Sequence, residues 1–383
     1  MDERIYPFTI DIPEDVLRDL RQRLLGTRWP DAETCAGWDQ GTPFAYAREM
    51  AAYWADGYDW RRCETRLKQW QHLRTDIEGV PIHFIQRRSA NPDALPLLIT
   101  HGWPGSIIEF HKVIEPLADP AAHGGDADDA FHLVIPSLPG YGFSGKPAQT
   151  GTSVEKIAGM WATLMERLGY QRYVAQGGDW GSLVTLAMAA GEPEGLTGVH
   201  VNMPVASPDP ESMESPTQAE QAALAALEHY QRWDSGYARQ QATRPQSLAY
   251  GLADSPVGQM SWILEKFAAW TDCERDGARH PENALHRDEL LDNIMFYWLT
   301  NSAGSSARLY WESFHSTGFE PIALPVGCSL FPKEILRTSR RWAEKRFHNL
   351  IYWTELPKGG HFAAFEQPEL FVGELREAFR CLR

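Results

Sequence analysis

Hydrophobic positions in the first 72 residues recur with the period of an α-helix. Apolar residues over 16–24 are three or four positions apart, which places them on one helix face. A proline precedes this run and a glycine follows it, as is typical of helix ends. The same spacing predicts further helices over residues 43–54 and 60–70. We therefore expect residues 1–72 to form a helical N-terminal domain.

From about residue 73 the pattern changes to short apolar runs, typical of buried strands, with helical stretches between the later ones. Strands that alternate with helices predict an α/β fold, with a mainly parallel sheet covered by helices on both faces. The predicted strands cover residues 80–85, 95–100, 133–136, 170–175 and 198–202, and the predicted helices cover residues 107–117, 154–168 and 183–190.

The alternation stops near residue 204, and helical spacing returns over the next hundred residues. Ser215-Pro216-Thr217-Gln218 has the pattern of a capping box at a helix start. This segment reads as a helical cap inserted into the core. Sheet character then resumes over 322–331 and 349–356, before a last helix over 368–379. The expected units are the N-terminal domain (1–72), the first part of the core (73–204), the cap (205–316) and the second part of the core (317–383).

Composition and charge describe a globular protein that binds neither nucleic acid nor an anionic membrane. The chain has 383 residues and a net charge of -15, so it presents no positive partner to a polyanion. Its five cysteines are scattered without a CxxC pair, which argues for reduced thiols and against a structural zinc. No signal-peptide pattern and no apolar run near ~20 residues is found. We expect a cytoplasmic protein, and a homo-oligomer is compatible with the sequence.

The stretch 177–182, Gly-Gly-Asp-Trp-Gly-Ser, carries the most specific chemistry. It joins a predicted strand to a predicted helix, with glycines two positions on either side of Asp179, which is the arrangement of a nucleophile elbow. Because an Asp carboxylate has a reference pKa near ~3.9, Asp179 is ionised at neutral pH and can attack a carbon that bears a leaving group. The structural alternative is a glycine-rich turn with a helix-capping Asp.

An ester on the nucleophile would need an activated water, and therefore a histidine later in the chain. His361 follows the last predicted strand, where this arrangement places its general base. An acid between the two should orient the imidazole. No Asp lies between residues 318 and 361, and the candidate acids are Glu320, Glu334, Glu344 and Glu355. Position favours Glu334, because it directly follows the end of a predicted strand, where functional groups gather.

The turn His101-Gly-Trp-Pro-Gly lies at the end of another predicted strand. Backbone amides in this turn, at Trp103, could join the amide of Trp180 after the nucleophile. Together they would form an oxyanion hole for the tetrahedral intermediate of ester hydrolysis. The alternative is a tight turn without a chemical role.

These motifs jointly resemble the epoxide hydrolases of the α/β-hydrolase fold. The resemblance rests on His101-Gly-Trp-Pro-Gly, Pro139-Gly-Tyr-Gly-Phe-Ser, Gly177-Gly-Asp-Trp-Gly and Gly360-His361. The N-terminal region is similar to that of the microsomal and juvenile-hormone type, as seen in Pro7-Phe8 and Thr27-Arg-Trp-Pro-Asp. The acid motif of that type is similar to Phe331-Pro-Lys-Glu334. The microsomal type carries an N-terminal membrane anchor that this sequence lacks, so we do not expect membrane attachment.

The resemblance implies an enzyme that converts an epoxide and water into a vicinal diol, without metal or organic cofactor. In the family, two tyrosines of the cap hydrogen-bond the epoxide oxygen, and Tyr237 and Tyr310 lie in the matching motifs. Asp179 would form the ester, and His361, held by Glu334, would activate the water. Fifteen Trp, 13 Tyr and 16 Phe suit the enclosure of a small apolar or aromatic epoxide.

Two other functions remain open at this stage. A haloalkane dehalogenase shares the Asp nucleophile but needs halide-binding donors in place of an acid pair. A catalytically silent binding protein could also use this fold. The joint presence of Asp179, Glu334 and His361 argues against a silent protein, because such a protein has no need of all three.

Overall fold

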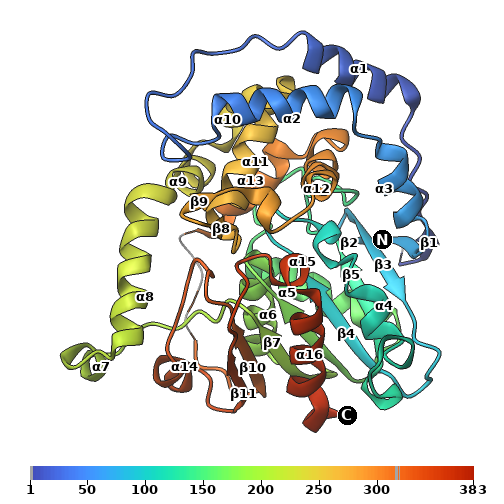
Figure 1. Ribbon diagram of the computed structural model, residues 1–383. Coiled ribbons are helices and arrows are strands. Elements are labelled where there is room, and N and C mark those ends of the chain that lie inside the picture. Colours follow the sequence, from blue (N-terminus) through green and yellow to red (C-terminus); the bar gives the residue numbers. More distant parts are fainter. Residues whose placement is uncertain (1–2, 315–317, 319) are drawn as a thin grey trace.

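The computed structural model describes residues 3–314, 318 and 320–383, and its centre is a nine-stranded sheet (Figure 1). The strand order is β1-β2-β3-β5-β4-β6-β7-β10-β11. The first four strands in this order pair antiparallel, and all neighbours from β5 to β11 run parallel. The mainly parallel α/β sheet predicted from the sequence is therefore confirmed.

The strands of the sheet are β1 (Ile5–Pro7), β2 (Gln71–Ile77), β3 (Val80–Arg87), β4 (Leu95–Thr100), β5 (Phe131–Pro136), β6 (Tyr173–Gly177), β7 (Leu196–Val201), β10 (Val326–Leu330) and β11 (Leu350–Glu355). A separate hairpin consists of β8 (Glu274–Arg275) and β9 (Ala278–Arg279).

The α-helices are α1 (Glu14–Leu25), α2 (Phe44–Asp56), α3 (Trp60–Leu67), α4 (Ile114–Ala118), α5 (Val154–Arg167), α6 (Trp180–Gly191), α7 (Pro210–Glu214), α8 (Gln218–His229), α9 (Gly236–Thr243), α10 (Pro245–Asp254), α11 (Pro256–Trp270), α12 (Arg287–Leu299), α13 (Ala303–Ser313), α14 (Arg340–Arg346), α15 (Ala363–Glu366) and α16 (Pro368–Phe379). A π-helical turn, η4 (Tyr230–Asp234), joins α8 to α9. Short 3₁₀ turns are η1 (Ile107–Phe110), η2 (Ala121–His123), η3 (Ala127–Asp129), η5 (Pro281–Asn283) and η6 (Arg380–Leu382).

Helices cover both faces of the sheet, because its central strands are apolar on both sides. In β4, five of the six residues are buried, as expected for a strand with helices on either face. In Figure 1, α4 and α16 lie in front of the sheet, and α5 and α6 lie behind it. Ser153 caps α5 by accepting a hydrogen bond from the amide of Lys156. One face of α5, including Ile157, Trp161 and Leu164, is buried.

The cap helices α9 to α13 lie above the sheet, and the N-terminal helices α1 and α2 lie above the cap (Figure 1). Side chains join these layers. The Tyr53 hydroxyl donates to Asp288 of α12 at 2.6 Å, and the Tyr58 hydroxyl donates to Asp292 of the same helix at 2.7 Å. The N-terminal helices therefore hold the cap from the side opposite the sheet.

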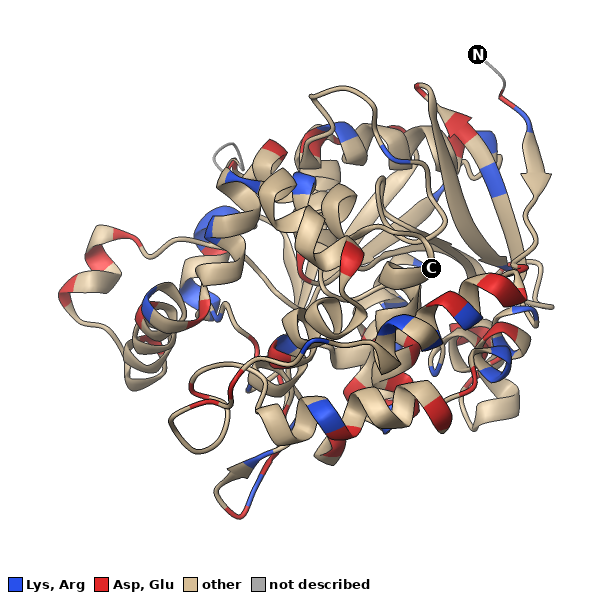
Figure 2. Cartoon of the chain, turned by 90° about the horizontal axis from the view of Figure 1, so that it is seen from above, with Lys and Arg blue, Asp and Glu red and all other residues tan. Residues whose placement is uncertain are grey.

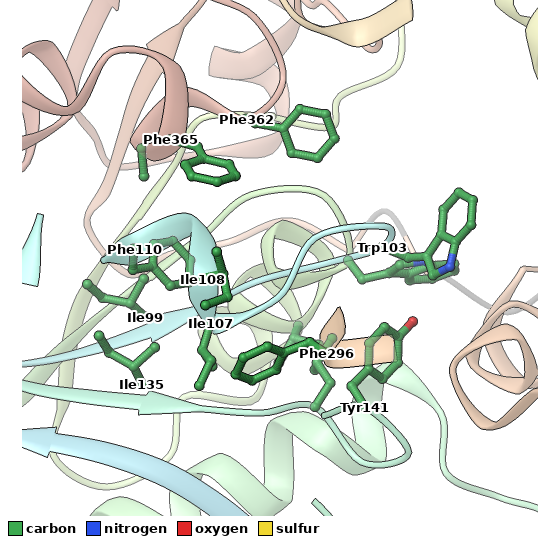
Figure 3. Packing of buried hydrophobic residues seen from close by; sticks show 14 of the residues in the cluster. Ile99, Trp103, Ile107, Ile108, Phe110, Ile135, Tyr141, Phe296, Phe362 and Phe365 are labelled. Carbon is green, nitrogen blue, oxygen red and sulfur yellow. The ribbon is translucent and has the colours of Figure 1, made fainter. Parts of the chain in front are cut away.

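One buried cluster runs from the sheet into the cap. It includes Ile99 of β4, Tyr141 of the loop after β5 and Phe296 of α12, which appear together in Figure 3. Trp103, in the turn after β4, and Phe362, directly after His361, belong to the same cluster. The loops that carry the candidate site are thus fixed by the core on which they rest.

Charged residues of both signs lie along the outer helices and loops of the molecule (Figure 2). Lys and Arg alternate with Asp and Glu there, as in the ion pair between Arg340 and Glu344 on α14. The excess negative charge is therefore spread over many elements. Among the described residues, no helix is long and apolar enough to span a membrane.

The structure differs from the sequence prediction in several places, among them a short hairpin, β8–β9, in the segment predicted to be helical. The sheet starts earlier, since β1 and β2 precede the first predicted strand. β1 has only three residues, and β2 mixes charged with apolar positions, so neither has a clear period. The capping box of α8 uses Thr217 and Glu220, because Ser215 lies outside the helix. The predicted helix over 107–117 is two short turns, η1 and α4.

Candidate active site

Asp179 lies at the sharp turn between β6 and α6. Its backbone has a φ of 53° and a ψ of -129°, a left-handed conformation that is strained for a non-glycine residue. Two glycines make this turn possible. A Cβ on Gly177 would lie 2.0 Å from the Gly181 carbonyl oxygen, and a Cβ on Gly181 would lie 2.0 Å from the Thr100 carbonyl oxygen. Any side chain there would force the strand and the helix apart.

Both carboxylate oxygens of Asp179 have partners. Oδ1 accepts a hydrogen bond of 2.7 Å from the backbone amide of Trp103, in the turn after β4. Oδ2 lies 3.2 Å from Nε2 of His361, in the loop after β11. Trp180 is the first residue of α6, so its amide is one of the amides that lack a partner within the helix. Loops from three parallel strands therefore meet at one carboxylate.

Glu334 holds the other nitrogen of His361. Nδ1 of the imidazole is 2.6 Å from Oε1 of Glu334, and both side chains are only 1% exposed. The same oxygen accepts the amide of Ile335 at 2.7 Å. The backbone amide of His361 donates to the Trp270 carbonyl at 2.9 Å, which ties this loop to cap helix α11.

The three other candidate acids lie away from the imidazole. Glu344 forms an exposed ion pair with Arg340. Glu355 is exposed at the end of β11, beside Trp353. Glu320 is exposed as well. Among the four acids weighed from the sequence, only Glu334 contacts His361.

Two opposing effects act on the pKa of His361. Burial favours the neutral ring and would lower the pKa, but the carboxylates of Glu334 and Asp179 favour the imidazolium. The carboxylates prevail and raise the pKa of His361 well above its usual value. Both carboxylate contacts therefore favour the imidazolium form of His361.

The cap brings Tyr237 and Tyr310 to the same place although they are far apart in sequence. The Tyr237 ring, on α9, stacks on Trp103 at 4.8 Å with an angle of 11°. The Tyr310 ring, on α13, packs edge-on against Trp180 at 4.7 Å, and the two tyrosine rings are 5.7 Å apart. Burial raises the pKa of each phenol well above its usual value, so both stay protonated and can donate.

Two residues at the site, Glu109 and Tyr230, have no sequence motif that would have identified them. Glu109 lines a cavity of about 20 Å³ beside Asp179 and His361, and burial raises its pKa to about 8. Its carboxyl occupies the space left by Gly105, since a Cβ on that glycine would lie 1.5 Å from Oε1. Tyr230 contacts Tyr237, with 3.0 Å between the hydroxyl oxygens.

Potential metal ligands do not gather in the described part of the chain. Groups of three or more His, Cys, Asp or Glu side chains that could hold a metal ion are not found there. All five cysteines are free thiols.

The chain is similar to known proteins over nearly its whole length. The profile described as "Epoxide hydrolase N terminus" matches residues 5–110, and the profile "alpha/beta hydrolase fold" matches residues 96–259. A Stigmatella aurantiaca protein named "Putative epoxide hydrolase" is 52% identical over 380 residues, covering 99% of this chain and 86% of the relative. "Epoxide hydrolase 1" of Oryctolagus cuniculus is 34% identical over 406 residues, covering 98% and 88%.

Solved structures give the same result. The crystal structure of juvenile hormone epoxide hydrolase from the silkworm Bombyx mori matches with a TM-score of 0.92 and 32% identity, covering 100% of this chain and 96% of that chain. The structure of Aspergillus niger epoxide hydrolase matches with a TM-score of 0.89 and 31% identity, covering 99% and 97%. The chain therefore belongs to the microsomal and juvenile-hormone epoxide hydrolase family, and it is an epoxide hydrolase with the α/β-hydrolase fold.

Proposed function

We propose that this enzyme hydrolyses a small apolar or aromatic epoxide to a vicinal diol through a covalent ester on Asp179. The observation that carries the proposal is the position of Asp179 at a strained elbow, in contact with His361. Both buried tyrosines lie close enough to respond to its charge. A carboxylate held in this way needs no base to become a nucleophile. The chemistry requires no metal or organic cofactor.

In the first step, an Asp179 oxygen bonds to one epoxide carbon while the carbon–oxygen bond of the ring breaks. The electron pair remains on the epoxide oxygen, which takes a proton or hydrogen bonds from the Tyr237 and Tyr310 hydroxyls. General-acid help of this kind is typically worth about 10²–10⁴-fold. The aromatic surroundings of the two phenols, Trp103 and Trp180, would pack against the apolar part of the substrate.

The second step is hydrolysis of the ester, and the charges around His361 suit this order of events. Ester formation removes the negative charge from Asp179, which is one of the two groups that raise the pKa of His361. The pKa therefore falls after the first step, and the imidazole can release its proton to water, which balances the proton that a tyrosine gave to the epoxide oxygen. Neutral His361, oriented by Glu334, then takes a proton from water, and the hydroxide attacks the ester carbonyl carbon.

The ester carbonyl must then carry a negative charge in the tetrahedral intermediate. The Trp103 amide already donates to Oδ1 of Asp179 at 2.7 Å, and the Trp180 amide starts α6 at its positive end. We assign these two amides to the oxyanion hole. As the intermediate collapses, the bond between the carbonyl carbon and the substrate oxygen breaks and His361 gives its proton to that oxygen, which releases the diol. The new carboxyl of Asp179 then returns its proton to His361, so both groups end as they began.

A haloalkane dehalogenase would use the same nucleophile on a different leaving group. A halide leaves without a proton, whereas an alkoxide is a strong base and needs an acid. Two buried, protonated phenols near Asp179 favour the epoxide.

Localisation in the cytoplasm and the oligomeric state remain predictions.

Product analysis tests this function. The purified enzyme is incubated with a panel of aryl and alkyl epoxides and with matched haloalkanes, with diol and halide measured separately. We expect diol from the epoxides and no halide release, and Asp179→Ala should yield neither. Single Phe replacements of Tyr237 and Tyr310 should slow ester formation, and the double replacement should nearly abolish it. Halide release at a rate comparable to diol formation would contradict the assignment.

A further inference from the structure

The two cap tyrosines lie in different surroundings, and this difference bears on which of them gives up a proton. The Tyr310 ring contacts the rings of Trp103 and Trp180. The Tyr237 hydroxyl instead lies 3.0 Å from the hydroxyl of a third tyrosine, Tyr230. Tyr237 is buried, whereas Tyr230 is only half-buried. A chain of two hydroxyl groups thus leads from the reaction site toward the outside of the cap.

Tyr230 is held in this place by an irregular turn. It is the first residue of the π-helical turn η4, in which the amide of Ser235 donates to the Tyr230 carbonyl at 2.8 Å. Asp234, at the end of the turn, accepts hydrogen bonds of 2.7 Å from Lys266 and 2.6 Å from Trp270. Lys266 is itself buried, with its ammonium 4.7 Å from the centre of the Tyr237 ring. Single π turns occur frequently at functional sites.

Hydrogen-bond counting gives the direction of the contact between the hydroxyl groups. In the free enzyme either oxygen can be the donor. A phenol has one proton, so when Tyr237 donates to an epoxide oxygen, its own oxygen can only accept. Tyr230 must then donate to Tyr237.

This arrangement matters because burial opposes loss of the Tyr237 proton. Burial raises the pKa of Tyr237 well above its usual value, so a bare phenolate there would be costly. A donor at 3.0 Å stabilises the phenolate with a charge-assisted hydrogen bond, which is about twice as strong as a neutral one. Tyr310 has one such donor, because a hydrogen bond from Trp180 acts to lower the pKa of Tyr310. Tyr237 has in addition the positive charge of Lys266 beside its ring.

Resting on the proposed function, we propose that Tyr230 is a positioning residue that makes Tyr237 the proton donor in ring opening, while Tyr310 only donates a hydrogen bond. As the ring opens, the Tyr237 proton moves to the epoxide oxygen and the Tyr230 proton moves to Tyr237. Tyr230 recovers a proton from solvent water at the outer side of the cap. The relay leaves both phenols as they began.

A double-mutant cycle tests the proposal, with the alkylation rate measured by stopped-flow tryptophan fluorescence in single turnovers. Tyr230→Phe keeps the ring and removes only the hydroxyl. It should slow alkylation by about 10-fold, the lower end for a hydrogen bond to a charged group, and leave ester hydrolysis unchanged. The same loss should appear on the Tyr310→Phe background but vanish on the Tyr237→Phe background. Tyr250→Phe, exposed on α10, should alter the rate less than about twofold.

A second measurement needs no variant and is independent of folding. The alkylation rate of the wild-type enzyme is followed across mixtures of H₂O and D₂O. Two protons in motion should give a curved dependence on the deuterium fraction, and one proton a linear dependence. A linear plot, or equal losses from Tyr230→Phe on both backgrounds, would overturn the inference.

The outcome is separable from failure of the proposed function. His361→Gln should accumulate the ester, visible as a mass increase of the intact protein after reaction with the epoxide. If this adduct forms while Tyr230→Phe alkylates at the wild-type rate, only the role of Tyr230 is wrong. If no adduct forms, the ester mechanism itself fails.

Discussion

Replacement of Glu334 by Gln isolates the charge that the second half-reaction requires. Oε1 of Glu334 lies 2.6 Å from Nδ1 of His361, and both side chains are 1% exposed. Gln keeps the size of the side chain and can still accept the Nδ1 proton, so the ring orientation is retained while the negative charge is lost. In the ester intermediate Asp179 is uncharged, and Glu334 is then the remaining carboxylate in contact with the imidazole.

The size of the effect follows from this contact. A hydrogen bond to a charged group is worth about 1.5–3 kcal/mol, and each ~1.36 kcal/mol is tenfold in rate. Loss of the charge should therefore slow ester hydrolysis by about 10–150-fold. Alkylation should change less than about threefold, because Asp179 attacks without help from His361.

Rapid mixing followed by acid quench and intact-protein mass spectrometry measures both steps in one experiment. Glu334→Gln should show a normal rise of the ester adduct and a slow decay, and Glu344→Gln should match the wild type. Circular dichroism is needed as a check, because Oε2 of Glu334 has no hydrogen-bond partner among the described residues and a buried amide there would be unsatisfied. Fast decay in folded Glu334→Gln, or slow decay in Glu344→Gln, would refute the reasoning.

Two further predictions concern the elbow and the pH response. Gly181→Ala should prevent folding, because its Cβ would lie 2.0 Å from a backbone carbonyl oxygen. Gly159→Ala is the control: its Cβ would have nothing within 4 Å, so the change should be neutral or stabilise the fold by about 0.5–1 kcal/mol. Soluble yield and thermal melting measure both effects. Asp179→Ala should lower the pKa of His361, since Asp179 helps to raise it. In NMR titrations the imidazolium should therefore persist to a higher pH in the wild type, and equal pKa values would contradict this.

Much of the fold was predictable because its elements have a strong local period. The helix over 368–379 was predicted with the bounds that α16 has, and the apolar run over 95–100 coincides with β4. Strand β2 was missed because its seven residues include Gln, His, Arg, Thr and Asp. Its place is determined by pairing with β1 and β3, which is a long-range property without a local signal.

The candidate site was predictable where a motif or the chain order fixes a residue. Asp179 and His361 carry such signals, and the structure places their side chains in contact. No sequence signal marked Tyr230. A π turn sets the direction of its side chain, and the residue spacing of a regular helix does not indicate such a turn. Glu109 had none either, since its position depends on the space that Gly105 leaves empty.

The central claim is that the new oxygen of the diol comes from Asp179 and not directly from water. A single turnover in ¹⁸O-labelled water, with enzyme in excess over epoxide, tests it by mass spectrometry of the diol and of the peptide that contains Asp179. The ester mechanism predicts an unlabelled diol in the first turnover and one ¹⁸O atom in the Asp179 carboxylate. A labelled diol with an unlabelled Asp179 would show that water attacks the epoxide directly, and would contradict the mechanism.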